Sequence, residues 1–289
     1  MTSDRRVLGV ALALTSATSF GILPVLTKVI YDDGAEPVGV LAVRFAIAAA
    51  VLQVLALGRR EARPRGRTLA VLLLLGGVGY VGQALCYFFA LERISAGLTA
   101  LLLYFFPALV VVLHALVSRT RPRPLALVCV GLATTGTAMT VGPLQGGQTT
   151  GMLLALSAAL VYAVYILLSS RVTGVGPLSS AAWVLTASAV VMGALALITS
   201  PRLPSTPTAW LALVGVALIG TVVGVTTFFA ALALLGPSDT AVISTFEPVV
   251  SIAVAALVLG ERLSLLQLAG GAVVLVAVAT LARSRPVPV

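Results

Sequence analysis

One carboxylate interrupts a long apolar stretch near the end of the sequence. Glu247 lies about eight residues inside the stretch 240–259, roughly 12 Å below a membrane surface at the helical rise of about 1.5 Å per residue. A charge at that depth costs about 3 kcal/mol or more, so such groups usually face a cavity or a partner. Ser244, Glu247 and Ser251 share one helix face, and Pro248 removes a neighbouring backbone hydrogen bond. The carboxyl could contact a bound molecule or take up a proton, or it could be a structural group that locks helices together.

Two basic side chains and the single histidine also fall inside apolar stretches. Lys28 lies near the end of the first stretch, where its long side chain could reach the membrane surface. Arg44 is about seven residues deep, too deep for that reach, and Glu247 is the one intramembrane carboxylate available to it. Arg44 could therefore take part in coupling transport to an ion gradient, or it could form an ion pair that fixes helix packing. His114 could relay a proton, or pack near the membrane interface.

Amphipathic side chains share helix faces in two of the stretches. Tyr80, Gln83 and Tyr87 follow i, i+3, i+7 spacing, and Tyr162 and Tyr165 lie three apart. Aromatic rings with hydroxyl and amide groups suit an organic ligand, which makes these residues candidates for a binding site. Packing and hydrogen bonding between helices is the alternative reading.

Other kinds of chemistry have little support in the sequence. The two cysteines, Cys86 and Cys129, lie inside apolar stretches, and one histidine cannot build a multi-histidine metal site. No glycine-rich loop precedes Lys-Ser or Lys-Thr, so ATP hydrolysis is not indicated. An embedded enzyme would need an acid/base or metal cluster at the interface. We therefore expect no cofactor, no metal and no enzymatic activity.

The composition requires a bilayer around the chain. Of 289 residues, 60% are hydrophobic and 9% are charged, whereas soluble domains carry roughly 25% charged residues. A helix needs about 20 apolar residues to cross the hydrocarbon. Cutting at charge and Pro/Gly clusters predicts an all-α membrane protein with ten transmembrane helices, at about 7–30, 37–57, 68–90, 96–117, 124–142, 150–170, 179–199, 208–232, 240–259 and 264–283.

The arginines predict how these helices are oriented. Connections on one side carry most of them: Arg5, Arg6, Arg59, Arg60, Arg63, Arg65, Arg67, Arg119, Arg121, Arg123, Arg171, Arg283 and Arg285. The other side carries only Arg93, Arg202 and Arg262, with Asp32, Asp33 and Glu36 in its first loop. Basic connections face the cytoplasm, so we expect both termini there, in the cytoplasmic membrane. No aromatic residues are interleaved with the clusters, which argues against a nucleic-acid partner despite the net charge of +9.

The two halves of the chain resemble each other. Phe88-Phe-Ala-Leu91 matches Phe229-Ala-Ala-Leu232, and Thr99-Ala100 and Phe105-Phe-Pro107 match Thr240-Ala241 and Phe246-Glu-Pro248, all at an offset of 141 residues. At an offset of 142, Gly9 to Thr15 matches Gly151 to Ser157, and Phe20 falls on Tyr162, which adds Phe20 to the candidate binding residues. Pro107 and Pro248 are then equivalent helix kinks. We predict five-helix repeats at 1–143 and 144–289. Because each repeat has an odd number of spans, the second repeat is inserted in the membrane with inverted topology relative to the first.

The chain resembles the EamA family of the drug/metabolite transporter superfamily. The resemblance rests on the repeated motifs above and on Leu259-Gly-Glu-Arg-Leu-Ser264, with Val43-Arg44-Phe45 as further support. The first half departs from the pattern, with Arg119-Thr-Arg121 in place of Gly260-Glu-Arg262. The resemblance implies a ten-helix carrier, often an exporter of amino acids and other metabolites. It also implies a central cavity between the first, third, fourth, sixth, eighth and ninth helices, which contain the stripes above.

The expected partners are then a small-molecule substrate, the lipid bilayer and a coupled proton, with energy drawn from a gradient and substrate held between repeats that open alternately. A membrane-embedded enzyme and a channel are the alternatives.

Overall fold

The computed structural model describes residues 3–91, 93–94, 99, 102–121, 124–141, 149–259 and 264–283. In these ranges all regular structure is helical. The first half contains α1 (Ser3–Asp32), α2 (Pro37–Gly58), α3 (Gly66–Leu74), the π-helix η1 (Leu75–Tyr80), α4 (Val81–Leu91), α6 (Phe106–Ser118) and α7 (Pro124–Val141). The second half contains α8 (Thr149–Ser169), α9 (Pro177–Thr199), α10 (Pro207–Gly215), the π-helix η2 (Val216–Val223), α11 (Gly224–Leu235), α12 (Pro237–Ser244), α13 (Glu247–Leu259) and α14 (Leu265–Arg283).

Proline and left-handed residues set many of the helix ends. Proline opens α2, α9, α10 and α12, where its missing N–H would have no intrahelical partner anyway. Arg119 and Ser200 end α6 and α9 with φ of 51° and 45°, and Gly34 follows α1 with φ of 86°. The left-handed region stops a helix, and glycine enters it at no steric cost.

Helix boundaries repeat along the chain at the offset of 141 residues. Gly66 and Leu74, the limits of α3, correspond to Pro207 and Gly215, the limits of α10. Each is followed directly by a π-helix, η1 or η2, and then by α4 or α11. The limits of α6 and α13 correspond in the same way, and each helix is preceded by a two-residue turn, at 104–105 and 245–246. The sequence repeat is therefore also a repeat of helix breaks.

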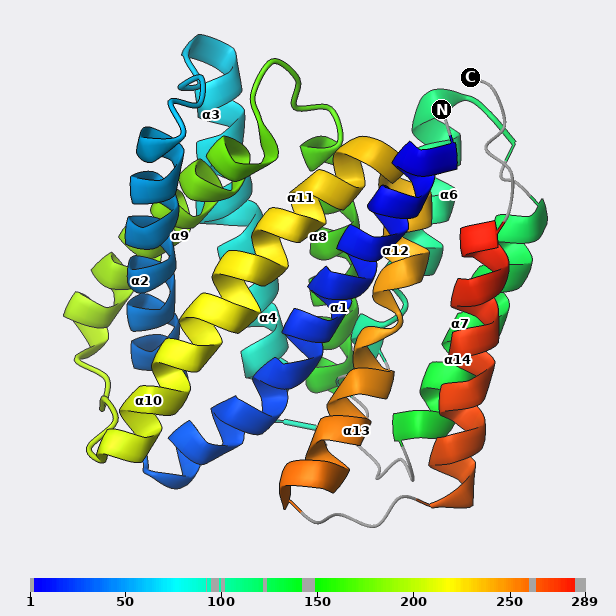
Figure 1. The fold of residues 1–289 in the computed structure, drawn as a ribbon. Coiled ribbons are helices and arrows are strands. Elements are labelled where there is room, and N and C mark those ends of the chain that lie inside the picture. The colour runs from blue at the N-terminus through cyan, green and yellow to red at the C-terminus, as the bar shows by residue number, and fades with distance from the viewer. Residues whose placement is uncertain are drawn as a thin grey trace.

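Packing between helices follows the same symmetry. α1 packs against α11 and α13 of the second half, and α8 packs against α4 and α6 of the first. The equivalent pairs α2 with α9 and α7 with α14 pack directly against each other (Figure 1). Close contacts match too, because a Cβ at Gly9 would meet Leu235 and a Cβ at Gly151 would meet Ile94. Exchanging the halves leaves the arrangement unchanged, as a twofold axis between them requires.

The halves are inverted relative to each other. The Glu61 carboxylate, just after α2, accepts a 2.9 Å hydrogen bond from the backbone N–H of Ser179 at the start of α9. At the opposite end, Arg202, just after α9, donates from Nε to Glu36 at the start of α2, at 3.1 Å. Equivalent helices that run antiparallel require an axis perpendicular to them. Figure 1 shows the same for α1 and α8, which run in opposite directions.

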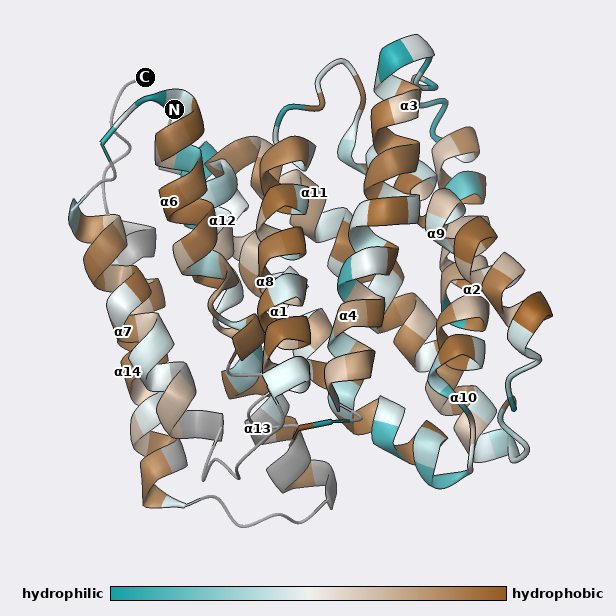
Figure 2. Ribbon diagram, turned by 180° about the vertical axis from the view of Figure 1, so that it is seen from behind, coloured by the Kyte–Doolittle hydropathy of each residue, from teal (hydrophilic) through white to brown (hydrophobic). Residues whose placement is uncertain are grey.

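The molecule presents hydrophobic side chains outward, as a protein in lipid must. Leu197, Ile198 and Leu211 are more than 70% exposed, and brown helices surround the molecule in Figure 2. Within the described residues, six helical segments are long and apolar enough to cross a membrane: Asp4–Asp32, Pro37–Gly58, Gly66–Ala90, Thr149–Ser169, Pro177–Thr199 and Pro207–Leu235. Three shorter apolar helical stretches accompany them, Phe106–Ser118, Pro124–Gly136 and Leu268–Thr280. The chain is thus a multi-pass membrane protein, while the number of ten spans stays a prediction.

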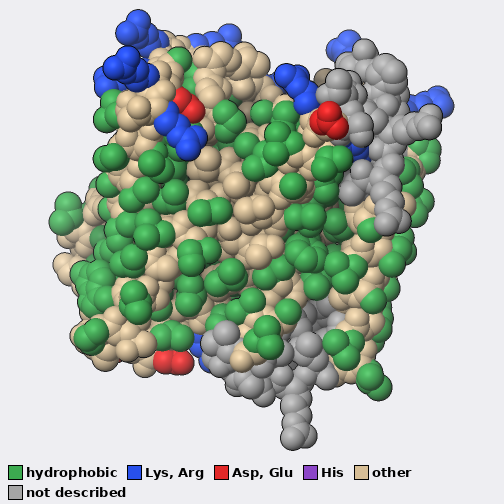
Figure 3. Space-filling model, viewed as in Figure 1, with side chains coloured by type: hydrophobic (Ala, Val, Ile, Leu, Met, Phe, Trp, Pro, Cys, Tyr) green, Lys and Arg blue, Asp and Glu red, His purple; other side chains and the backbone are tan. Residues whose placement is uncertain are grey.

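Basic side chains gather at one end of the molecule. The arginines near the start of α1 and in the connection from α2 to α3 are at the top of Figure 3, while Asp33 and Glu36 follow the opposite end of α1. The end of α14 is on the same side as the start of α1 (Figure 1). Some residues of the sequence argument are outside the described part of the chain, namely Arg123, Arg262, Arg285, Ala100 and the Gly260-Glu-Arg262 motif.

Candidate functional site

The ninth predicted helix is broken directly before Glu247. α12 ends at Ser244, Thr245 and Phe246 form the turn, and Glu247 is the first residue of α13. The continuous polar stripe expected on one helix is therefore wrong: Ser244 donates to Thr240 O at 2.9 Å, within α12. Ser251 likewise donates to Glu247 O, at 3.1 Å within α13. The break places the carboxyl at a helix start, deep inside the bundle.

The fourth helix is broken at the equivalent position, and this break provides a neighbour for the carboxyl. Tyr104 occupies the turn before α6, is 8% exposed and lies beside the Glu247 carboxyl, with which it interacts electrostatically. Pro107 and Pro248 are each the second residue of their helix. Where the sequence predicts kinks, the structure has two-residue turns, at 104–105 and 245–246, between two helices. A proline in the first turn of a helix removes no intrahelical hydrogen bond.

Arg44 is held by the π-helix of the other half. Its Nε donates a 2.6 Å hydrogen bond to Thr221 Oγ1, and Thr221 in turn donates to Val216 O, five residues earlier, at 3.0 Å. The guanidinium carbon also lies 5.4 Å from the centre of the Phe45 ring. π-Helical turns occur frequently at functional sites, because they redirect side chains and backbone groups.

Arg44 and Glu247 do not form an ion pair in this structure. They interact electrostatically, but no nitrogen of Arg44 lies within 4.0 Å of a carboxylate oxygen of any described residue. The expectation of a direct pair that fixes helix packing is therefore not met in this structure. The two charges lie inside the bundle with side chains of other helices around them.

A continuous series of aromatic rings leads from Arg44 toward Glu247. Ring centres are 5.4 Å apart for Phe45 and Tyr80, 5.8 Å for Tyr80 and Tyr165, and 6.1 Å for Tyr165 and Tyr162. The series continues over Phe106, 4.7 Å from Tyr162, to Tyr104, 6.3 Å from Phe106. These rings come from α2, η1, α8 and the broken fourth helix. Tyr80, Tyr87 and Tyr162 all interact electrostatically with Glu247.

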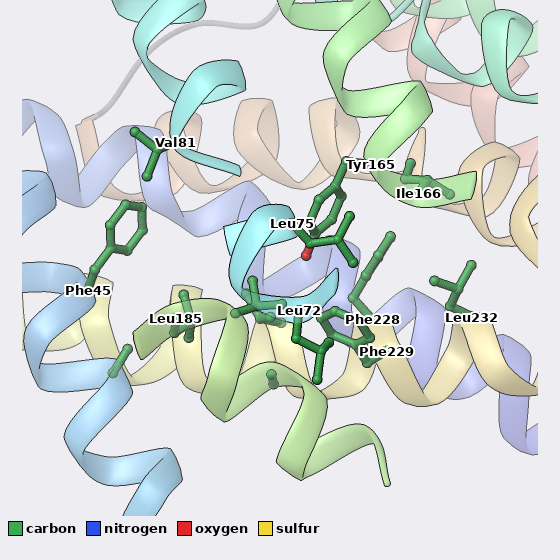
Figure 4. Close-up of a cluster of buried hydrophobic side chains, with 14 of the residues drawn as sticks. Phe45, Leu72, Leu75, Val81, Tyr165, Ile166, Leu185, Phe228, Phe229 and Leu232 are labelled. Carbon is green, nitrogen blue, oxygen red and sulfur yellow. The ribbon is translucent and has the colours of Figure 1, made fainter. Parts of the chain in front are cut away.

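The predicted binding residues divide by accessibility. Most keep part of their surface accessible within the bundle: Phe20, Tyr80, Gln83, Tyr87, Tyr162 and Glu247. Tyr165 is 3% exposed and Ser244 is 6% exposed. Tyr165 lies against Gly79 and, with Leu75, Phe228 and Phe229, belongs to the large apolar cluster of Figure 4. Of the accessible group, Tyr80, Tyr87 and Tyr162 lie near Glu247, whereas Tyr165 and Ser244 are buried.

Lys28 and His114 both lie toward the C-terminal ends of their helices. Lys28 is exposed on α1. His114 Nδ1 lies 3.0 Å from Ser238 Oγ, near the basic end of the molecule. Close by in sequence, Asp239 in the first turn of α12 forms a buried 3.1 Å ion pair with Arg6 at the start of α1. This end of α1 is therefore tied to α12.

Sequence reasoning did not find Tyr104, Thr221 or the Arg6–Asp239 pair. Tyr104 directly precedes the Phe-x-Pro motif, so the repeat contained a signal for it. Thr221 is the repeat equivalent of Tyr80 at 141 residues, but a threonine in an apolar helix carries no signal by itself. Among the described residues, no group of three or more His, Cys, Asp or Glu side chains is arranged to hold a metal ion.

Comparison with known proteins agrees with this architecture. A solved structure described as "Crystal structure of protein" superimposes with a TM-score of 0.79 over 94% of this chain and 95% of that chain, at 21% sequence identity. That likeness shows the fold alone. No curated protein matches the sequence. The profile of the EamA-like transporter family matches residues 7–142 and again residues 149–283. Two matches, one per half, cover nearly the whole chain, which therefore belongs to the EamA-like transporter family.

Proposed function

We propose that this protein is a secondary carrier that exports small metabolites such as amino acids across the cytoplasmic membrane by alternating access. In this proposal the chain crosses the membrane ten times, with repeats at 1–143 and 144–289 and both termini in the cytoplasm. A central cavity between the repeats holds the substrate. Membership of a transporter family supports carriage over enzymatic activity.

One observation carries the proposal. Arg44 and Glu247 come from different halves, lie inside the bundle and do not neutralise each other by direct contact. An uncompensated charge in the apolar part of a membrane is costly and usually faces a water-filled cavity or a bound molecule. Accessible aromatic side chains, including Tyr80 and Tyr162, lie between and around the two charges. Such a site suits a small organic molecule with groups of opposite charge.

The inverted halves support alternating access. Equivalent halves on opposite sides of a site offer two similar ways to open it. Helix breaks at 104–105 and 245–246 and the two π-helices provide matching positions where helices can bend. Because energy would come from a gradient, Glu247 is also the residue we propose for binding a coupled proton.

Counterflow in liposomes tests this function. Vesicles loaded with a mixture of unlabelled amino acids should transiently accumulate the labelled mixture against its gradient, because a carrier exchanges substrate through one site. A channel equilibrates the label without overshoot, and an enzyme shows neither behaviour. Thr227→Val is a matched control, since Thr227 bonds only carbonyl oxygens of its own helical segment, Val223 O and Gly224 O. Absence of overshoot in folded protein would contradict the carrier proposal.

A further inference from the structure

A buried hydroxyl near Arg44 has no hydrogen-bond partner. Tyr31, near the end of α1, has its hydroxyl oxygen enclosed, and no described residue donates to it or accepts from it. Leaving such a group unsatisfied is unfavourable, because the hydrogen bonds that it makes to water in the unfolded chain are not replaced. Neighbouring helices hold its ring in place: Phe88 of α4 contacts it edge-on at 6.5 Å between ring centres, and Val216 belongs to the apolar cluster against which it packs.

Arg44 has unused donors in the same region. Tyr31 and Arg44 interact electrostatically, and Val43, next to Arg44, packs against the same apolar cluster as Tyr31. Nε of Arg44 is bound by Thr221, whereas its two terminal nitrogens make no hydrogen bond or ion pair with the described part of the chain. Guanidinium nitrogens are donors only. The side chain is therefore oriented through one nitrogen, and its other donors remain available.

Thr221 is well suited to this orienting role. Its hydroxyl proton is used in the bond to Val216 O, so the oxygen is left to accept from Arg44 Nε. The bond to a carbonyl five residues earlier belongs to the π-helix itself, which connects the orientation of Arg44 to the conformation of η2. Thr221 is thus a positioning residue, which acts on a ligand through Arg44.

We infer that Arg44 and Tyr31 form an anion subsite that binds the carboxylate of the substrate, with Thr221 positioning the guanidinium. A carboxylate accepts hydrogen bonds without donating any, which complements a guanidinium and a phenol hydroxyl, and charge-assisted bonds are the stronger kind. The subsite lies toward the end of the bundle that carries Asp33 and Glu36, since Tyr31 is one residue from the end of α1. Glu247 and its aromatic neighbours would then receive the rest of the molecule. This inference rests on the proposed function, because it names the chemical group by which the carrier holds its substrate.

The test uses benzoate, with benzamide as its neutral analogue of similar shape. Purified full-length protein is unfolded thermally in detergent over a series of concentrations of each probe, because a ligand of the folded state raises the unfolding temperature according to its dissociation constant. We expect benzoate, and not benzamide, to stabilise the wild-type protein. Tyr31→Phe should raise the benzoate dissociation constant roughly tenfold or more, since one hydrogen bond to a charged group is lost.

Two threonine variants separate positioning from general packing. Thr221→Val should weaken benzoate binding, and Thr221→Ser should restore it, because only the hydroxyl orients Arg44. Thr227→Val, the same methyl-for-hydroxyl change at a half-buried position of α11, should leave the benzoate response unchanged. Equal responses to benzoate and benzamide, or unaltered benzoate binding by Tyr31→Phe and Thr221→Val, would overturn the subsite. Benzoate binding that depends on Tyr31 in a protein without counterflow would uphold the subsite and reject the carrier. Counterflow in a protein whose benzoate binding does not depend on Tyr31 would uphold the carrier and reject the subsite.

Discussion

Arg44 and Glu247 lie within electrostatic reach of each other inside the bundle, yet they have different neighbours. Arg44 Nε donates to Thr221 of the second half, and the Glu247 carboxyl lies beside Tyr104 of the first half. Each charged residue therefore has a neighbour in the opposite repeat. A relative movement of the repeats would change these contacts, which links the site to the conformation of the whole molecule.

Glu247→Gln should abolish most transport while preserving the fold. Glutamine has nearly the same shape and can still pack beside Tyr104, but it has no negative charge and cannot release a proton. We expect the rate of counterflow to fall at least roughly tenfold. The reason is that the substrate would lose its charge-assisted hydrogen bond to the Glu247 carboxylate, and such a bond is worth about 1.5–3 kcal/mol. The residual activity should lose any pH dependence that proton binding at Glu247 gives the wild type. Initial rates of counterflow over a series of pH values provide the measurement. Normal rates with an unchanged pH profile would leave Glu247 with a structural role only.

Gly76→Ala should destabilise the protein. A Cβ at this position of η1 would collide with the backbone carbonyl of Val184 on α9, and Ser188 donates a 2.9 Å hydrogen bond to Gly76 O at the same contact. Overpacking of this kind costs about 1–3 kcal/mol. The thermal unfolding temperature in detergent measures the effect. Gly82→Ala is the control, because a Cβ there meets nothing within 4 Å and alanine favours a helix. Equal unfolding temperatures for both variants would show that the helices approach less closely than the structure indicates.

Replacing one member of the Arg6–Asp239 ion pair should lower the free energy of unfolding more than replacing both members. Side-chain exposures of 10% and 7% make this a buried pair. Arg6→Met or Asp239→Leu alone leaves a buried charge without this partner, at about 3 kcal/mol or more. The double variant removes both charges, so its loss of unfolding free energy should be smaller than the sum of the two single losses. A double-mutant cycle in detergent checks the prediction. Strict additivity would show that the two side chains do not interact in the folded protein.

Asp33 should stabilise the connection between α9 and α10 in a pH-dependent way. Hydrogen bonds from the backbone N–H of Ser205, at 2.5 Å, and of Thr206, at 3.2 Å, lower the pKa of the Asp33 carboxyl below its ordinary value of about 3.9. A lowered folded-state pKa means that the stabilisation is complete above the unfolded-state pKa and is lost as pH falls through the folded-state value. Asp33→Ala should therefore lower the unfolding temperature at pH 7, with the difference from wild type narrowing below about pH 4.

The neighbouring Asp32 supplies the control for that series. It is exposed at the last residue of α1, and Asp32→Ala should leave the unfolding temperature nearly unchanged at both pH values. A difference between wild type and Asp33→Ala that stays constant from pH 7 to pH 3 would show that the carboxylate charge is not what stabilises the connection.

Much of the fold could be predicted because lipid imposes simple rules on sequence. Apolar length gave the helices α2 and α9 to within two residues at each end, and the register of 141 residues gave the equivalence of the halves. The prolines predict disturbed helices at Pro107 and Pro248, and the structure has a two-residue turn directly before each of the two helices that contain them. A proline in the sequence shows that one backbone N–H donor is missing. Whether the helix then bends or is divided into two helices depends on the tertiary contacts around the proline.

The sequence predicted those site residues that carry an ionisable group in an apolar stretch, because burying such a group in a membrane is costly. Glu247 and Arg44 were found for that reason. Thr221 and Tyr31 were not, because neither residue type is unusual in a membrane helix. Their roles follow from a π-helical turn and from the position of one hydroxyl, both of which are tertiary properties. Tyr165 was selected by spacing alone, and the structure buries it against Gly79, a distinction that periodicity cannot make.

Access to the site from both sides of the membrane is the central claim, and a single cysteine tests it most directly. Gln83 lies on α4 among the accessible side chains near Tyr80 and Tyr87, and Cys86 and Cys129 can be replaced by alanine to provide a background without thiols. Gln83→Cys in that background should react with a membrane-impermeant maleimide both in right-side-out and in inverted vesicles, and excess substrate should slow both reactions. Labelling from one side only, or from neither, in protein that still shows counterflow would contradict an alternately opening central site.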